Sequence, residues 1–329
     1  MFINFMEKFV IFNQKAIYSV LIALAGYIAF LLKRRTNGPI CDKKADMSGK
    51  IILVTGGNKG IGKAVVKELS KMGGRLIIAS RDKKSALATI SEINNTHPNL
   101  TIEYMYIDLS KTESIILFAS NFKQKYQNLH ILINNAGIIS YDRELNNKNQ
   151  ESTIATNYLG HYLLTYLLLD LLRKSAPSKI INVSSNYHLG AEYNFDDFNF
   201  EKSWNSKYAY KVSKLYQVMM TKQLHKYYHK DRIYSYSLSP GFVRSNIFWN
   251  RPWFSKIWIC VLYPYLYIFA KDCFYGAQTI IYLAVENDRN LVSGEYYRDL
   301  KVFPSSKLAL SDENNTKLWE KTKEILNLN

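Results

Sequence analysis

The stretch KIILVTGGNKGIG, residues 50–62, decides the fold of this 329-residue chain. Its first six residues form an apolar run typical of a buried strand, and a helical pattern follows to about Met72. The glycines between them let the backbone take strained conformations and approach a ligand closely. A strand, a glycine-rich turn and a helix in this order form the context in which a dinucleotide pyrophosphate binds at a helix N-terminus. The stretch therefore predicts a dinucleotide-binding fold.

Five further apolar runs continue the alternation of strands and helices. They cover residues 75–79, 102–107, 130–133, 179–184 and 233–238. This order predicts an α/β fold with a doubly wound parallel sheet of the Rossmann type, in which ligands bind at the carboxyl ends of the strands. A long helix is expected over residues 151–174, and it carries Asn157 and His161.

The end of the second strand indicates which dinucleotide binds. Arg81 stands there, and Lys59 lies nearby in the glycine turn, so two cations favour the 2′-phosphate of NADP. Asp82 leaves NAD as a possible cofactor, because an acidic residue here accepts a hydrogen bond from the ribose 2′-hydroxyl of NAD. The alternative is that Arg81 and Asp82 simply open the next helix. After the third strand, Asp108 is expected to cap a helix beginning near Ser110 and to meet the adenine.

Tyr210, Lys214 and Ser185 together suggest proton transfer. Tyr210 and Lys214 are four residues apart, which puts them on one face of a helix. A free tyrosine has a pKa near ~10, and a nearby ammonium lowers that pKa toward neutral pH. Ser185 ends a strand, where its hydroxyl could bind the oxygen of a carbonyl or alcohol. Taken alone, the Tyr–Lys pair is better explained by a solvated helix face, because such a pair occurs by chance in most long helices.

Composition excludes several other classes of protein. A hydrophobic content of 47% is ordinary for a globular chain. The net charge is +16, but the lysines are scattered and no nucleic-acid-binding module is legible, so no nucleic-acid partner is expected. The three cysteines form no CxxC pair and show no metal-ligand spacing with the six histidines, so no metal site is expected. Attraction to anionic lipid explains the positive charge better than nucleic-acid binding does.

The N-terminal segment predicts a membrane anchor. Residues 16–32 carry no charge, and Lys33, Arg34 and Arg35 close them; 17 residues is the lower limit for crossing a bilayer. A cleaved signal peptide and a buried core helix are the alternatives, although a small-residue cleavage site is missing. The basic residues after the span place the rest of the chain in the cytosol, with the anchor in the endoplasmic reticulum or another organelle membrane.

A strongly aromatic segment covers residues 246–270. Pro252 and Pro264, with Arg251 and Lys256, argue against a second transmembrane helix. An apolar lid over a lipophilic substrate, at about residues 245–271, explains the composition better, and plain core packing is the alternative.

Five motifs in this order resemble the short-chain dehydrogenase/reductase superfamily. They are the glycine turn, Asn134-Asn135-Ala136-Gly137, Ser185, Tyr210-xxx-Lys214 and Pro240-Gly241. Other stretches, such as Asn157-Tyr158-Leu159-Gly160-His161, are similar to the retinol dehydrogenase and WW-domain oxidoreductase-like branch. Ser239 stands where that branch commonly has His, which leaves the substrate open.

The resemblance implies roles for individual residues. Tyr210 would be the general acid/base, and Lys214 would lower its pKa and hold the nicotinamide ribose. Ser185 would orient the substrate oxygen, and Asn157 would hold a water that relays protons from Lys214. The cofactor contacts implied are Gly56, Lys59, Gly60, Ile61, Gly62, Arg81, Asp108, Asn134, Ala136, Gly137, Tyr210, Lys214, Pro240 and Val243.

The sequence therefore predicts a membrane-anchored oxidoreductase. Residues 1–35 form the anchor, 36–47 a linker and 48–329 one catalytic domain. The expected reaction moves hydride between NADP(H) and an alcohol/carbonyl pair on a retinoid, steroid or lipid aldehyde. Two alternatives are a catalytically silent nucleotide-binding scaffold and an NAD-dependent dehydrogenase of a small polar substrate. The resemblance also implies a homodimer that pairs through its two long helices.

Overall fold

The computed structural model describes residues 2–245 and 267–328. Most of the predicted aromatic lid, residues 246–266, lies outside the described residues. The two flanks of that segment lie together, since Lys271 N donates to Phe242 O at 2.7 Å and Arg244 N donates to Lys271 O at 2.9 Å.

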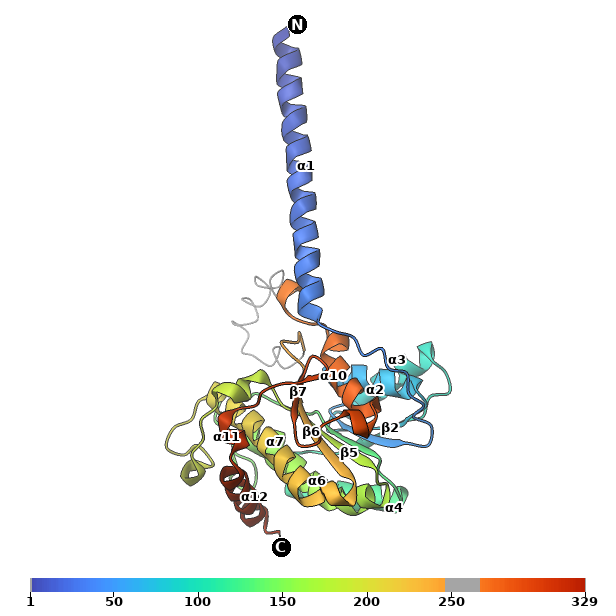
Figure 1. The fold of residues 1–329 in the computed structure, drawn as a ribbon, viewed down its shortest axis with the longest axis vertical. Coiled ribbons are helices and arrows are strands. Elements are labelled where there is room, and N and C mark those ends of the chain that lie inside the picture. Colours follow the sequence, from blue (N-terminus) through green and yellow to red (C-terminus); the bar gives the residue numbers. More distant parts are fainter. Residues whose placement is uncertain (1, 246–266, 329) are drawn as a thin grey trace.

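An eight-stranded sheet forms the centre of the domain, in the order β3-β2-β1-β4-β5-β6-β7-β8 (Figure 1). Every neighbouring pair up to β7 is parallel, and β8 is antiparallel to β7. The reversal of order between β1 and β4 makes the sheet doubly wound, which confirms the Rossmann-type prediction. The strands are β1 Ile51–Thr55, β2 Arg75–Ser80, β3 Ile102–Tyr106, β4 Ile131–Asn134, β5 Ser178–Val183, β6 Ile233–Ser239, β7 Tyr296–Arg298 and β8 Lys301–Val302.

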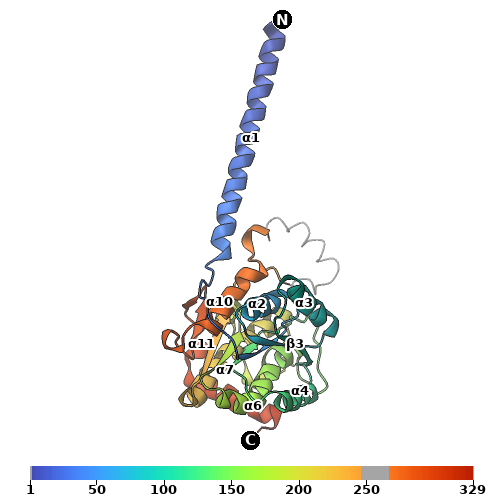
Figure 2. The same cartoon turned by 90° about the vertical axis from the view of Figure 1, so that its right-hand side faces the viewer.

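Helices cover both faces of the sheet (Figure 2). Successive residues of a strand point to opposite faces, so Ile52 and Val54 belong to one apolar core and Leu53 to the other. The first core lies under α2, α3 and α10, and the second under α4, α6 and α7. The helices are α2 Gly60–Lys71, α3 Lys83–Thr96, α4 Thr112–Lys125, α5 Ser152–Ile154, α6 Gly160–Lys174, α7 Ser206–Tyr228, α10 Cys273–Val285, α11 Lys307–Leu310 and α12 Asp312–Leu326.

The N-terminal helix α1, Phe2–Asn37, projects away from the domain (Figures 1 and 2). The sequence predicted a transmembrane span over residues 16–32. Within the described part of the chain, no helix is both long and apolar enough to cross a bilayer, so the structure does not show that span. The predicted linker packs on the domain: Cys41 N donates to Gln278 Oε1 at 2.9 Å, and Met47 is buried.

The C-terminal helix α12 covers part of α6 and α7. The Trp319 ring lies 4.7 Å from Tyr162 and 5.3 Å from Tyr227. The hydroxyls of Tyr158 and Thr322 are 2.7 Å apart, and both side chains are buried. The two long helices that were expected to face a second copy are therefore partly covered by the chain's own C-terminus.

Candidate active site

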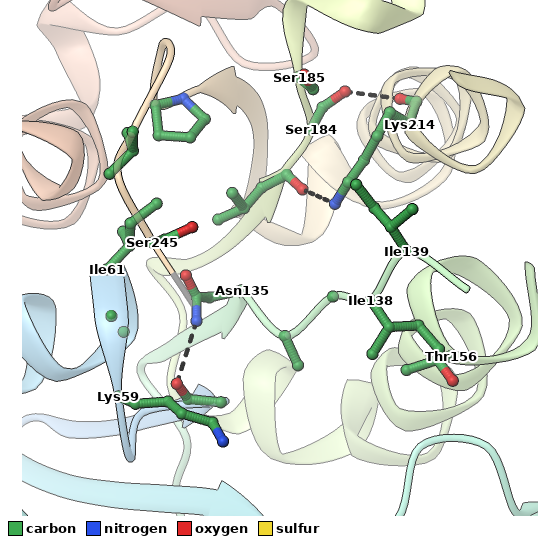
Figure 3. Close-up of a pocket in the computed structure, with 18 of the residues that line it drawn as sticks. Lys59, Ile61, Asn135, Ile138, Ile139, Thr156, Ser184, Ser185, Lys214 and Ser245 are labelled. Atoms are coloured by element: carbon green, nitrogen blue, oxygen red, sulfur yellow. Dashed lines mark hydrogen bonds between the residues drawn. The ribbon is translucent and has the colours of Figure 1, made fainter. Parts of the chain in front are cut away.

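A cavity of about 530 Å³ opens at the carboxyl ends of the strands. It extends from the glycine turn to the start of α7 (Figure 3). Most of the predicted site residues line it, and they come from the six segments that follow β1 to β6 and from helix α7. The predicted residues that line the cavity are Gly56, Lys59, Gly60, Ile61, Gly62, Arg81, Asp108, Ala136, Gly137, Ser185, Tyr210, Lys214, Pro240 and Val243.

The glycine turn that joins β1 to α2 has a backbone conformation that residues with a side chain rarely adopt. Gly56 and Gly60 have φ values of 65° and 58°, in the left-handed region. A Cβ on Gly62 would lie 2.3 Å from Gly56 O, so a side chain there would push the turn apart. The first N–H groups of α2 have no intrahelical partner, and they face the cavity with the positive end of the helix dipole.

The two cations expected to meet a 2′-phosphate, Lys59 in the glycine turn and Arg81 after β2, have different contacts in the structure. Lys59 Nζ lies 3.8 Å from Asp82 Oδ2, and Asp82 Oδ1 accepts from Ser85 N at 3.0 Å, which caps α3. Asp82 is therefore already used as the cap of α3, and its contact with Lys59 is a longer ionic one. Arg81 is exposed and makes no hydrogen bond or ion pair with any described residue.

Two predicted contacts are placed differently from expectation. The prediction that Asp108 caps the next helix was wrong: that helix begins at Thr112, and Asp108 Oδ1 instead accepts from Ser110 N and Ser110 Oγ, at 3.1 and 2.7 Å. Asn134 does not line the cavity, because β4 turns its side chain into the core. There its Nδ2 donates to Thr165 Oγ1 and Asn182 Oδ1 at 3.0 and 2.8 Å.

The two adjacent serines after β5 have different partners. Ser184 is buried, and its hydroxyl donates to Lys214 O at 2.6 Å (Figure 3). The Ser185 hydroxyl accepts from Tyr187 N at 3.3 Å and lies close enough to the Tyr210 phenol to lower its pKa. The geometry thus leaves Ser185 as the serine that faces the phenol.

Tyr210 and Lys214 are close, but the ammonium does not bind the phenol. Lys214 Nζ donates to Val183 O at 2.8 Å and lies 5.6 Å from the Tyr210 ring centroid. Burial raises the pKa of Tyr210 to about 12, and the Ser185 hydrogen bond offsets only part of that rise. Burial lowers the pKa of the Lys214 ammonium to about 8. The expected lowering of the phenol pKa is therefore absent here, because desolvation raises that pKa by more than the interaction with Ser185 lowers it.

Asn157 lies in a π-helical turn, Ala155–Leu159, that interrupts the long helix predicted over residues 151–174. Its side chain is fully buried behind the cavity wall and binds both backbone groups of Ile138: Oδ1 accepts from N at 2.8 Å and Nδ2 donates to O at 3.0 Å. Nδ2 also donates to Ser213 Oγ at 3.0 Å. Single π-turns inside α-helices are frequent at functional sites. Here the turn fixes the loop that follows β4.

His161, one turn further along, also holds that loop. Its Nε2 is 2.9 Å from Thr55 Oγ1, which accepts from Asn135 N and Ala136 N at 2.9 and 3.0 Å. Burial lowers the pKa of His161 to about 4, so the imidazole is neutral at pH 7. The buried network therefore fixes the glycine turn and the loop after β4 to each other.

Sequence reasoning missed the apolar residues of the cavity. Ile138, Ile139, Tyr187 and Phe242 line it, and the last two expose about half of their side chains. The Tyr187 ring stands edge-on to Tyr210, with centroids 6.1 Å apart. The available signal in the sequence was an aromatic residue two positions after Ser185.

Comparison with known proteins finds long, clear similarities. The family model described as short chain dehydrogenase matches residues 50–253. Retinol dehydrogenase 12 from Homo sapiens is 35% identical over 311 residues, which cover 93% of this chain and 97% of the human protein. Retinol dehydrogenase 13 from Homo sapiens is 35% identical over 302 residues, 91% of both chains.

Solved structures share the fold. An uncharacterized protein from Mycobacterium paratuberculosis has a TM-score of 0.72 at 24% sequence identity, over 88% of this chain and 98% of that one. The NADP complex of RhlG from Pseudomonas aeruginosa has a TM-score of 0.60 at 23% identity, over 76% and 94%. At these identities the likeness concerns the fold alone.

Proposed function

The chain belongs to the short-chain dehydrogenase family, in its retinol dehydrogenase-like branch, and from this membership we propose an NADP(H)-dependent reaction on a lipophilic alcohol or carbonyl compound. The single observation that carries the proposal is the meeting of Ser185, Tyr210 and Lys214 at one end of the cavity that begins at the glycine turn. Three separate stretches of sequence have to fold correctly to bring this about: the glycine turn, the segment after β5 and helix α7.

Tyr210 is the proposed proton donor and acceptor. With its pKa raised to about 12, the phenol is protonated at pH 7 and is ready to donate to a carbonyl oxygen. The Ser185 hydroxyl, bound to the phenol, is placed to bind the same oxygen and stabilise charge that develops on it. Buried Lys214 supplies positive charge beside the two. A nicotinamide would supply or accept the hydride.

The cavity fits a dinucleotide phosphate. The N-terminus of α2 offers free N–H groups for a pyrophosphate, and Gly62 keeps that space clear of a side chain. Asp108 and Leu109 line the cavity beyond the ends of β2 and β3, where an adenine would lie. Arg81 supports NADP over NAD because it has no other partner among the described residues, whereas the Asp82 carboxylate is already occupied.

Replacing Arg81 with Ala should raise the KM for NADPH about tenfold and leave the KM for NADH nearly unchanged. The reason is the loss of one charge-assisted hydrogen bond to a 2′-phosphate, worth about 1.5–3 kcal/mol when well formed. Steady-state kinetics with both cofactors provide the measurement. Lys84→Ala is the matched control, because it removes the same charge from an exposed position outside the cavity. Equal losses with NADH and NADPH would contradict the assignment.

A lipophilic substrate is supported by the apolar mouth of the cavity. Tyr187 and Phe242 line it and are 50% and 45% exposed, and walls of apolar and aromatic side chains with a few polar groups are typical of small-molecule sites. The relatives are named as retinol dehydrogenases, so a retinoid is the first substrate to test, followed by steroid ketones and long-chain aldehydes.

The test is turnover by the detergent-solubilised full-length protein with each of these compounds, using NADPH and NADH separately. Oxidation of NADPH by one of the lipophilic carbonyls is expected. Tight NADPH binding without turnover on the whole panel would favour the alternative of a catalytically silent scaffold. Failure to bind either nucleotide would refute the proposal.

Membrane attachment through α1 is also proposed, with the catalytic domain facing the cytosol. Four apolar side chains of this helix are more than half exposed, because the helix projects away from the domain. They are Leu21, Ile22, Leu24 and Phe30. Full-length protein should therefore co-float with liposomes, and replacing Ile22, Leu24 and Phe30 together by Ser should release most of it. Replacing Ile116 and Leu117, equally exposed residues of α4, by Ser is the control and should leave flotation unchanged. Flotation unaffected by the α1 changes would contradict attachment through this helix.

A further inference from the structure

His188 is fully buried beneath the turn that begins at Ser185, and both of its ring nitrogens bind backbone groups. Nδ1 lies 2.7 Å from Ser185 O, and Nε2 lies 3.2 Å from Ser306 N. A carbonyl can only accept and a peptide N–H can only donate, so the ring carries its hydrogen on Nδ1 and a lone pair on Nε2. Burial lowers the pKa of His188, which keeps this neutral form at pH 7.

The imidazole thereby connects two distant parts of the chain. Ser306 caps the N-terminus of α11 and lies 118 residues from His188 in the sequence. Tyr296 of β7 packs on the imidazole with ring centroids 4.5 Å apart, and its hydroxyl donates to Asn186 Oδ1 at 2.8 Å. The short 3₁₀ turn Asn186–Gly190, which brings Asn186 and Tyr187 to the cavity, is thus held from beneath by β7 and by the C-terminal segment.

We propose that His188 is a positioning residue, which fixes the backbone of Ser185 so that its hydroxyl stays directed at Tyr210. Ser185 O accepts from both His188 N, at 3.1 Å, and the imidazole Nδ1–H, and Ser306 N fixes the opposite side of the ring. His188 itself does not line the cavity, so it acts only through Ser185. The inference rests on the proposed function, in which Ser185 binds the substrate oxygen.

Two pairs of variants separate positioning from simple packing. His188→Phe keeps an aromatic ring against Tyr296 but removes both hydrogen bonds, whereas His188→Asn retains a donor that can reach Ser185 O. Ser306→Pro removes the N–H that binds Nε2 at a position whose φ of −56° suits proline. Ser306→Ala keeps that N–H, and like the proline variant it loses the hydroxyl that accepts from Leu308 N.

The expected result is a loss of kcat of about 10- to 100-fold in His188→Phe and Ser306→Pro, since a small displacement of a positioned group costs rates of this size. His188→Asn and Ser306→Ala should stay within about threefold of the parent by the same argument. NADPH affinity, measured by fluorescence titration, should be the same in all four. His130→Phe is the control: it loses the bond from Ile51 N at the amino ends of the strands, away from the cavity, and kcat should not change.

Two results would overturn the proposal. One is a lower melting temperature in His188→Phe with kcat per NADPH-binding molecule unchanged, and the other is an equal loss of kcat in the Asn and Phe variants. NMR of ¹⁵N-histidine-labelled protein gives a readout that does not need activity. The His188 signal is assigned as the imidazole signal that disappears in His188→Phe. In the parent protein this signal should show the hydrogen on Nδ1. A hydrogen on Nε2 would also overturn the proposal. If the parent binds NADPH but turns over no compound on the panel, the proposed function fails while this signal still reports on His188.

Discussion

Tyr210→Phe should lower kcat about 10³-fold and leave NADPH binding unchanged. General acid–base catalysis by a positioned side chain contributes roughly 10²–10⁴ in rate, and the phenol hydroxyl is the group at the end of the cavity that can carry the proton. The ring stays in place in the variant, so its packing against Tyr187 is kept. The measurement is single-turnover oxidation of NADPH with the best carbonyl substrate found on the panel.

Two controls make this prediction specific. Tyr208→Phe, two residues earlier in α7 and outside the cavity, should leave the rate unchanged. Ser185→Ala should lose a large part of the rate because its hydroxyl faces the phenol, whereas Ser184→Ala should act mainly on stability through its bond to Lys214 O. A Tyr210→Phe rate within tenfold of the parent would show that another group transfers the proton.

Lys214→Met should abolish most of the activity and at the same time stabilise the empty protein at pH 7. An ammonium whose pKa falls from 10.5 to about 8 on folding costs about 3 kcal/mol of stability at pH 7, since a tenfold change in proton affinity corresponds to about 1.4 kcal/mol. Loss of the hydrogen bond to Val183 O in the variant lowers its stability by about 1 kcal/mol and so offsets part of the gain from removing the buried charge. The free energy of unfolding should therefore rise by about 2 kcal/mol on these terms.

The pH dependence of that stabilisation identifies its cause. The folded pKa lies below the unfolded one, so the cost is fully present below pH 8 and disappears as the pH rises toward 10.5. Denaturant unfolding of both proteins at pH 7 and pH 10 should therefore show a difference at the lower pH that shrinks at the higher. Lys211→Met, at a site where the ammonium only donates to Gly190 O near the surface, should show no such difference. A destabilised Lys214→Met at pH 7 would refute the desolvation account.

The sequence was sufficient for the sheet and for most of the cavity wall because both depend on local patterns. Buried strands appear as apolar runs, and in a parallel sheet the residues just after each run must gather at one edge. Arg81, Ser185 and Gly62 accordingly line the cavity. Lys214 and Tyr210 were also brought together, as the helical spacing predicted.

What the sequence could not supply were quantities that depend on burial and on distant contacts. The pKa of Tyr210 is raised rather than lowered, because desolvation is a property of the folded surroundings. Asn134 turns into the core because its partners, Thr165 and Asn182, come from elements that follow much later in the chain. The contact of His188 with Ser306 spans 118 residues, and no local pattern announces it.

The position of α12 at the end of the chain has a consequence for biosynthesis. A ribosome completes α6 and α7 long before it reaches residue 312, so Tyr158 and Tyr162 have no cover from Trp319 or Thr322 during that interval. Exposed aromatic surface on an incomplete chain is the kind of surface that chaperones bind and that aggregates. Of these three helices, the one that is made last is thus the one that ends this exposure, and a nascent chain that terminates before α12 keeps the exposure.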